Sequence, residues 1–120
     1  MKDKLEPNMY VRTKRGTFDR FMTSKKIESL TWYKFEDRGS ITNPENYIIN
    51  ASHNIIDLIE VGDYVNGKKV IDTYTDYIFD YSEEFKVIRF SETDILHNVN
   101  HIKSIVTKEQ FSSMEYRIGE

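Results

Sequence analysis

The chain has 120 residues and a formal net charge of −3, a length that suits one domain with a buried core. It contains no cysteine, which excludes disulfide bonds and thiolate metal sites and is typical of a reducing compartment. No segment approaches the roughly 18 apolar residues of a membrane-spanning helix, and the first residues include no apolar signal segment. These features predict a soluble protein that is neither secreted nor held in a membrane.

Aromatic residues are frequent, with eight Tyr, seven Phe and one Trp, whereas Pro occurs only twice. This composition favours strands and argues against a helical bundle. Residues 1–38 carry ten Lys or Arg against six Asp or Glu, a balance of +4, whereas residues 39–120 carry seven against fourteen, a balance of −7. Either part could meet a charged partner, although folding commonly mixes such charges over one surface.

The beginning of the chain predicts strands joined by turns. Residues 1–8 are charged and lack periodicity, which predicts a flexible leader. Residues 9–13 and 17–23 flank a turn in which Gly16 can supply a positive φ, so we expect a hairpin there. Residues 26–35 are rich in β-branched and aromatic side chains and predict one further strand.

The middle of the chain contains the strongest local signal. The dipeptide Asn66-Gly67 is typical of a tight β-hairpin turn, which predicts pairing of residues 64–65 with residues 69–78. Residues 46–51 predict a short strand that ends before a polar cap residue. Isoleucines at helical spacing follow, and they predict a single helical turn near residues 54–60.

Two more strands and a second helical turn are expected towards the C-terminus. Residues 84–90 alternate apolar and charged side chains as a half-buried strand does, and residues 101–106 predict a further strand. Residues 107–110 form a capping box, which predicts a helical turn near residues 108–113. A last strand is expected at residues 115–118.

These elements predict a mainly β (α+β) fold in a single domain over residues 9–120. Short antiparallel strands would form a small barrel-like or curved sheet with one or two short helical turns, because no helix is long enough to cross between parallel strands. The residues expected in the core are Ile56, Leu58, Val61, Val70, Phe85, Val87, Phe90, Ile105 and Phe111.

No constellation of side chains indicates catalysis, a metal site or a cofactor. His97 and His101 have the spacing of two metal ligands on a helix, but the asparagines between them disfavour that helix. Glu83 and Glu84 are adjacent on a strand and point to opposite faces. The chain has no glycine-rich phosphate loop and no serine nucleophile elbow. The sequence therefore predicts a protein that is not an enzyme and that uses no metal and no cofactor.

One candidate surface is basic and lies on the first predicted hairpin. Its cations alternate with aromatic rings, and proteins use this combination to hold phosphates and stack the bases of single strands. The cations are Arg12, Lys14, Arg15 and Arg20, the rings are Tyr10, Phe18 and Phe21, and the pattern continues with Lys25, Lys26, Trp32, Tyr33 and Lys34. The alternative is that these rings face the core.

A second candidate surface is acidic. Residues 72–84 contain five acids and three tyrosines, and they could present phosphate-like charge to a basic partner with tyrosines as rigid anchors. The residues expected to bind this partner are Asp72, Asp76, Tyr77, Asp80, Tyr81, Glu83 and Glu84. The alternative is a solvated hairpin tip without a partner.

Three segments of the chain, residues 9–16, 51–67 and 102–120, resemble a family of small phage and prophage proteins of low-GC Gram-positive bacteria, clostridia and their relatives. The resemblance covers both ends and the middle of the chain. It supplies no catalytic residue. It implies an accessory protein that acts in the cytoplasm of an infected bacterial host.

Small acidic phage proteins without catalytic motifs often act by occupying a host protein. By this analogy we expect an anti-CRISPR-like inhibitor of a nucleic-acid-handling or defence system. The expected partner is a host protein with a basic groove, such as a CRISPR effector nuclease, and nucleic acid is a weaker expectation. Two other hypotheses stay open, a non-enzymatic nucleic-acid-binding β-barrel and an interaction module in phage assembly or scaffolding.

Overall fold

The computed structural model describes residues 5–78 and 83–114. These residues are mainly β-strands with one α-helix and three 3-10 helices, so the predicted mainly β fold is confirmed. The chain divides into two compact units, unit 1 (Met1–Leu58) and unit 2 (Ile59–Glu120). The sequence predicts a single domain over residues 9–120, and the observed strands pair within each of the two units.

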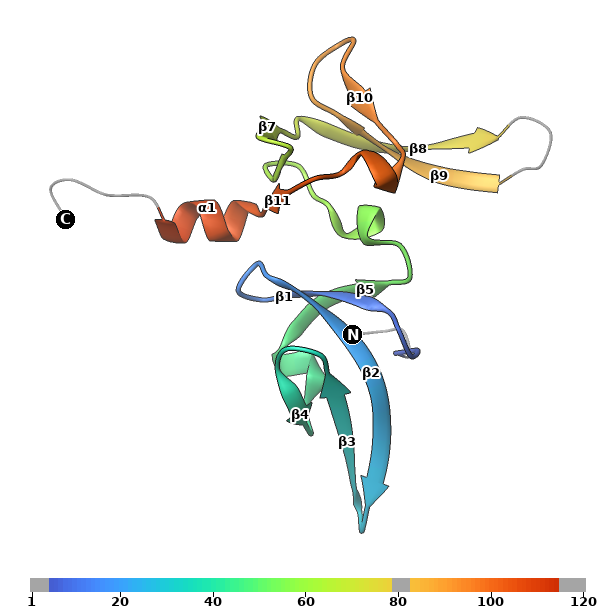
Figure 1. Cartoon of the computed structure of the whole chain (residues 1–120), viewed down its shortest axis with the longest axis vertical. Helices are drawn as coiled ribbons and strands as arrows, with labels where there is room; N and C mark the ends of the chain where they lie inside the picture. Colours follow the sequence, from blue (N-terminus) through green and yellow to red (C-terminus); the bar gives the residue numbers. More distant parts are fainter. Residues whose placement is uncertain (1–4, 79–82, 115–120) are drawn as a thin grey trace, which may run out of the picture. The chain divides into compact units, whose positions relative to one another are not determined.

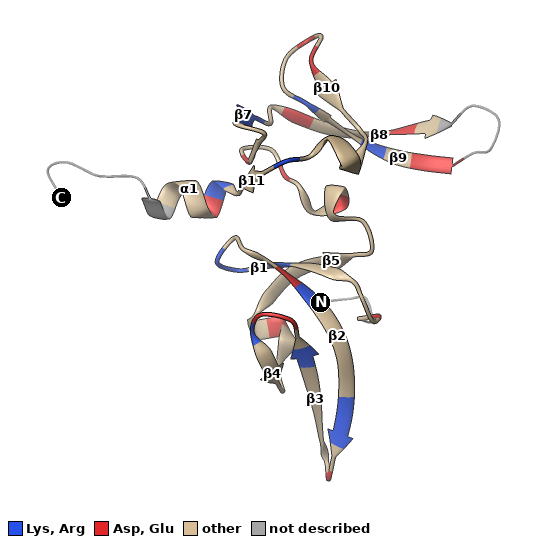
Figure 2. Cartoon of the chain, in the orientation of Figure 1, with Lys and Arg blue, Asp and Glu red and all other residues tan. Residues whose placement is uncertain are grey.

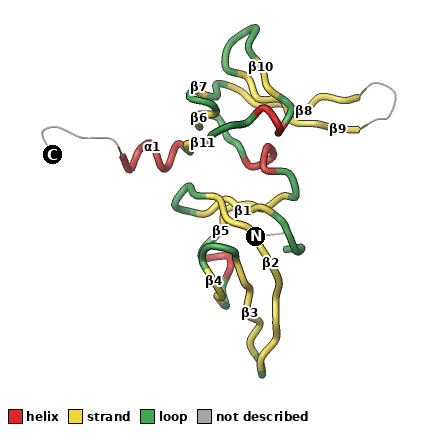
Figure 3. The backbone as a smooth tube through the Cα atoms, viewed as in Figure 1, coloured by secondary structure: helices red, strands yellow, loops and turns green. Residues whose placement is uncertain are grey.

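Unit 1 is built on one five-stranded sheet with the order β4-β3-β2-β1-β5, in which β2 and β3 form the longest hairpin (Figures 1 and 3). In chain order its elements are β1 (Tyr10–Thr13), β2 (Phe18–Ile27), β3 (Leu30–Phe35), β4 (Gly39–Ile41), the 3-10 helix η1 (Pro44–Asn46), β5 (Ile48–Ser52) and the 3-10 helix η2 (Ile55–Leu58). The expected first hairpin, the strand near residues 46–51 and the helical turn near residues 54–60 are confirmed.

The core of unit 1 packs against one face of this sheet. Its buried members are Leu5, Val11, Phe21, Phe35 and Ile48, and the half-buried residues that pack against them are Met9, Tyr33, Ile41, Tyr47 and Ala51. Ile41 belongs to the edge strand β4 and Ile48 to the opposite edge strand β5. Both edges of the sheet thus contribute to one core, and the described strands do not close into a barrel.

The expected single strand at residues 26–35 is wrong, because the chain reverses in its middle. Glu28 has a positive φ of 58° and begins a two-residue turn with Ser29. Ile27 of β2 then pairs with Leu30 of β3. The sequence does not reveal this turn because neither of its two residues is a Gly, Asn or Pro, the residues that usually mark one.

The first described residues pack against the sheet. Leu5 is only 7% exposed and belongs to the core of unit 1. The backbone N–H of Asn8 donates to the carbonyl of Phe21 at 2.8 Å. Residues 5–8 of the predicted flexible leader are therefore part of the folded unit, because burial of an apolar side chain holds them there.

Unit 2 contains two three-stranded antiparallel sheets, with the orders β10-β9-β8 and β11-β6-β7. Its elements are β6 (Tyr64–Val65), β7 (Lys68–Lys69), β8 (Asp72–Ile78), β9 (Glu83–Arg89), β10 (Ile95–Leu96), the 3-10 helix η3 (Val99–His101), β11 (Ile105–Val106) and the α-helix α1 (Lys108–Met114). The strand near residues 84–90 and the helical turn near residues 108–113 are confirmed. The strand expected at residues 101–106 is confirmed only at β11, and the one expected at residues 115–118 lies outside the described residues.

The turn predicted at Asn66-Gly67 is present. Both residues have positive φ, 53° and 79°, as the favoured two-residue hairpin turns require. The turn joins β6 to the short β7, so the expected pairing of residues 64–65 with the whole of residues 69–78 is wrong. The chain leaves this hairpin at Ile71, whose N–H donates to a carbonyl of β9 at 2.9 Å, and β8 then pairs with β9.

Much of the expected core is found buried. The residues exposed by 2% or less are Ile56, Leu58, Val70 and Val87. The half-buried residues are Phe85, Phe90 and Ile105.

The predicted burial of Val61 and Phe111 is wrong, since each is 49% exposed. Val61 directly precedes the turn at Gly62, where φ is +98°. Phe111 stacks its ring on Tyr64 at a centroid distance of 4.8 Å. Apolar character alone does not tell whether a residue beside a turn or on a short helix faces inwards.

Candidate nucleic-acid interface

A groove in unit 1 combines cations, an indole ring and amide side chains. Its cavity volume is about 930 Å³. These groups come from Lys14, Arg15, Trp32, Arg38, Asn43 and Asn46, with Asp37 as the carboxylate in the lining. We call this cavity the Trp32 groove. Figure 2 shows Lys and Arg on the β1–β2 turn and along β2 and β3.

The β1–β2 turn holds Lys14 and Arg15 in place. Gly16 adopts a φ of +86°, and its N–H donates to the carbonyl of Thr13 at 3.0 Å. The hydroxyls of Thr13 and Thr17 lie 2.6 Å apart. The N–H of Lys14 donates to the carbonyl of Tyr47 at 3.0 Å, which fastens the turn to the chain just before β5. Two exposed cations are thus presented on a backbone that is fixed on both sides.

The buried carboxylate of Asp19 fixes the opposite side of the groove. Its Oδ1 accepts from the N–H groups of Arg20 and Asp37 at 2.7 and 2.9 Å. Its Oδ2 accepts from the N–H of Arg38 at 3.1 Å and from the Tyr47 hydroxyl at 2.7 Å. Because these bonds reach both the β3–β4 turn and Tyr47, a single side chain on β2 positions two walls of the groove.

The ionised form of Asp19 is favoured in the folded protein. Burial by itself raises the pKa of this carboxyl, but hydrogen bonds from the backbone of Asp37, the Tyr47 hydroxyl and further backbone N–H groups lower it, and the net shift is downward. Burial and the bond to Asp19 raise the pKa of Tyr47 well above its usual range. The phenol therefore keeps its proton and remains a donor at neutral pH.

Trp32 lies on the face of β3 that points away from the core, since it alternates with the core residue Phe35 along the strand. The register pairs it with Lys25 of β2, so the two side chains share that face. Lys34 lies two residues further along β3 on the same face. A second, smaller cavity of about 250 Å³ is lined there by Thr23, Lys25, Ile27, Trp32, Lys34 and Ser40, and we call it the side pocket.

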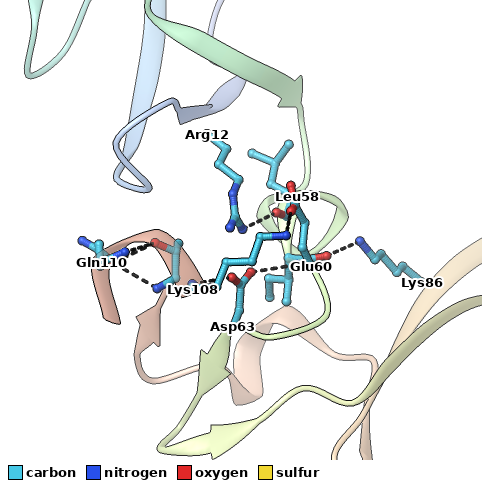
Figure 4. A network of polar contacts seen from close by, with 9 residues as sticks. Arg12, Leu58, Glu60, Asp63, Lys86, Lys108 and Gln110 are labelled. Carbon is cyan, nitrogen blue, oxygen red and sulfur yellow. Dashed lines mark hydrogen bonds and ion pairs between the residues drawn. The ribbon is translucent and has the colours of Figure 1, made fainter. Parts of the chain in front are cut away.

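Of the four cations predicted on the basic hairpin, the structure brings Lys14 and Arg15 to the groove and places the other two elsewhere. Arg12 is buried, and its guanidinium donates to the carbonyl of Leu58 at 3.0 Å, as Figure 4 shows. Arg20 is half-buried and lies over the ring of Tyr10 at 5.4 Å. Arg12 therefore does not join Lys14 and Arg15 on an exposed surface, because its side chain is buried, and the role of the other cations in binding stays a prediction.

The lining residues missing from the sequence-based prediction include Arg38, Asn43 and Asn46. In the sequence they lie in segments that read only as turn or loop residues. Their spatial neighbours Lys14 and Arg15 are more than twenty positions away along the chain. The fold brings them together because β1 pairs with both β2 and β5.

The described residues of the acidic segment lie on β8 and at the start of β9, which pair as an antiparallel hairpin, and the expected partner-binding residues among them lie on two faces. The register pairs Asp76 with Phe85 and Tyr77 with Glu84. Adjacent residues of a strand point to opposite faces, so Asp76 and Glu83 share one face and Tyr77 and Glu84 share the other. These four residues are exposed, and Tyr77 is exposed by 60%.

The remaining acidic candidates do not extend this surface. Asp72 is exposed but lies directly opposite Arg89, which offsets its charge. Asp80 and Tyr81 lie outside the described residues. The described members of the predicted acidic surface are thus exposed but divided between the two faces of the strand pair, and their role in binding a partner stays a prediction.

A polar network in unit 2 has a structural role (Figure 4). The buried carboxylate of Asp63 accepts from the N–H of Glu60 at 2.8 Å and from the N–H of Lys108 at 2.9 Å, which holds a turn and the start of α1 together. The Lys108 ammonium pairs with Glu60 at 2.6 Å. The predicted capping box is confirmed, since Thr107 and Gln110 exchange bonds at 3.1 and 3.2 Å.

The two histidines with ligand-like spacing do not form a metal centre. His97 packs its ring against Phe85 at 5.3 Å, and His101 ends η3. Residues 5–78 and 83–114 contain no group of three His, Cys, Asp or Glu side chains arranged to hold a metal ion. Within the same residues, no helix has the length and apolar character that crossing a membrane requires.

Comparison of the chain with protein-family models, with curated proteins and with solved structures finds no match.

Asp19→Asn should lower the free energy of unfolding of unit 1 by about 1.5–3 kcal/mol at neutral pH, since hydrogen bonds to a charged group are lost. The folded-state pKa of Asp19 lies below its unfolded value, so its stabilisation is present above about pH 4 and disappears as the pH falls further. The difference between wild type and variant should shrink accordingly. Denaturation followed by the fluorescence of Trp32, the only tryptophan, measures it.

The matched control is Asp37→Asn, which removes the same charge from an exposed neighbour. Its effect should stay within about 0.5 kcal/mol, as for most surface substitutions. Equal losses in the two variants would show that charge alone, rather than the bonds made by Asp19, is responsible.

Proposed function

We propose that this protein binds nucleic acid through the Trp32 groove. The observation that carries the proposal is the convergence of Lys14, Arg15 and Arg38 with the exposed indole of Trp32 around one cavity. Cations beside an aromatic ring hold the phosphate backbone while the ring packs against a base. The amides of Asn43 and Asn46 add donors and acceptors of the kind that contact base edges.

The negative total charge of the chain does not oppose this proposal, because the two units differ. Residues 1–58 contain ten Lys or Arg and eight Asp or Glu, a balance of +2, whereas residues 59–120 contain seven and twelve, a balance of −5. Contacts with phosphate depend on the charges near the groove. Salt at physiological concentration largely screens the interaction between exposed charges that lie more than about 8 Å apart.

The context of the proposal is an accessory role in a phage-infected bacterium, which the family resemblance supports. The single core shared by both edges of the unit 1 sheet supports the barrel-like or curved form that we expect of a small nucleic-acid-binding module. A protein of this kind needs no catalytic group, since occupying nucleic acid is itself the activity. The proposed site of action is the cytoplasm of the host.

Neutralising the groove should weaken binding and reduce its dependence on salt. For the triple variant Lys14→Gln, Arg15→Gln and Arg38→Gln, three phosphate contacts are lost, so the slope of log affinity against log salt should fall by about 2 on single strands. Fluorescence anisotropy of a labelled oligonucleotide over a range of salt concentrations measures both effects.

The matched control removes three exposed lysines outside the groove, with the variant Lys26→Gln, Lys69→Gln and Lys103→Gln. It changes the net charge equally and should leave the slope nearly unaltered. If both variants lose affinity alike, binding depends on total charge and the groove is not the site. If the wild type binds no oligonucleotide at low salt, the proposed function fails.

A second candidate function is inhibition of a basic host protein by the β8–β9 hairpin, as in anti-CRISPR proteins. The observation that favours it is the exposed Tyr77, which shares a face with Glu84 and so offers an aromatic anchor beside a negative charge. Opposite charge would speed the encounter with a basic groove on the partner. The ring of Tyr77 would become buried in the complex and would slow dissociation.

The two faces of the hairpin allow this candidate to be tested with a matched pair of variants. In bacteria whose CRISPR nuclease clears a targeted plasmid, the wild-type protein should restore plasmid survival. Tyr77→Ala with Glu84→Gln should abolish that effect, whereas Asp76→Asn with Glu83→Gln on the opposite face should keep most of it. No restoration by the wild type, or equal restoration by both variants, would contradict the candidate for this class of nuclease.

A further inference from the structure

We infer that the Trp32 groove and the side pocket form one continuous binding track that selects single-stranded nucleic acid, with Trp32 as the platform on which a base stacks. The inference rests on the proposed function and adds to it the strandedness of the ligand, the role of the ring and the path of the backbone. Trp32 and Ser40 line both cavities, so the two cavities meet at the indole.

Cations lie on either side of that meeting point. Lys14, Arg15 and Arg38 line the Trp32 groove, and Lys25 and Lys34 line the side pocket. A backbone that contacts both sets of charges must pass the indole between them. Trp32 is 36% exposed, and it lies on a strand that is paired on both sides, so the residue is accessible and its backbone is fixed.

The two cavities differ in what they can accept. The groove, at about 930 Å³, is at the upper end of the roughly 300–1,000 Å³ typical of small-molecule sites, and it offers amides and hydroxyls as well as cations. The side pocket, at about 250 Å³, is smaller and is bounded by Ile27 and the indole. We therefore place a whole nucleotide in the groove and only part of the next one in the side pocket.

This arrangement favours single strands because a base must leave its stack to meet the indole. In a duplex the faces of the bases are covered by their neighbours, whereas in a single strand they can turn outwards and stack on an aromatic side chain. Duplexes would still meet the cations, but they could not place a base against Trp32. The site should thus discriminate single strands from duplexes by stacking and not by charge.

Trp32 is the only tryptophan of the chain, so its fluorescence reports directly on the platform. Titration with an oligothymidine hexamer should quench this fluorescence, whereas a duplex of equal length should bind at least about tenfold more weakly with little quenching. In a series from thymidine monophosphate to longer oligothymidines, affinity should rise until both cavities are filled and then level off.

Trp32→Ala should weaken hexamer binding by about tenfold to a hundredfold, the range that loss of one stacked base implies, with duplex binding unchanged. Trp32→Phe should recover most of the loss, because any aromatic face can stack. The matched control is Tyr77→Ala, which removes an exposed ring from unit 2 and should change neither affinity. Labelled oligonucleotides followed by anisotropy serve for the variants that lack tryptophan.

The double variant Lys25→Gln and Lys34→Gln tests the track. Because both lysines are exposed, the substitutions should not disturb the fold. The variant should weaken binding of the hexamer while leaving binding of thymidine monophosphate, which the groove alone accommodates, unaffected. Salt-sensitive binding of hexamer and duplex with equal affinity, or hexamer binding without quenching, would overturn the inference and leave the proposed function standing. Absence of binding to either ligand would overturn both.

Discussion

The carboxylate of Asp19 accepts four hydrogen bonds at a position that is only 5% exposed, and the walls of the Trp32 groove are fixed through them. A buried charge is costly unless it is fully bonded, so this carboxylate holds its donors in one arrangement. Those donors include the backbone of Arg38 and the hydroxyl of Tyr47, which line the groove from two separate segments. Replacing Asp19 would therefore affect both the stability of unit 1 and the geometry of the groove.

Preorganisation of this kind matters for a ligand as flexible as a nucleic-acid strand. Binding requires side chains and loops to be ordered, and each ordered side chain costs roughly 0.5–1.5 kcal/mol. A site whose loop backbone is already fixed avoids the cost of ordering the loop. In the groove the turn around Gly16 is held by Thr13 and Tyr47, and Trp32 sits on a central strand. The long Lys and Arg side chains remain the adjustable part, which suits contacts with phosphates that carry no sequence information.

Local sequence patterns predicted local structure well and predicted the site only in part. The Asn66-Gly67 turn, the capping box from Thr107 to Gln110 and the first hairpin follow from residues that lie next to one another, and each is present. The β2–β3 turn was hidden because Glu28 adopts a positive φ without the usual residue type. Lys14 and Arg15 were identified as cations of a turn, but their meeting with Arg38 depends on strand pairing over long separations, which composition cannot reveal.

Nuclear magnetic resonance of the isotopically labelled full chain, titrated with an oligothymidine hexamer, locates the ligand most directly. The account predicts that the single indole N–H signal, the side-chain amides of Asn43 and Asn46 and the backbone amides of residues 14–16 and 37–38 shift together, with one affinity. Signals of the β8–β9 hairpin should stay in place. Shifts confined to that hairpin, or spread over all lysines without a change at Trp32, would contradict the claim that this groove is the nucleic-acid site.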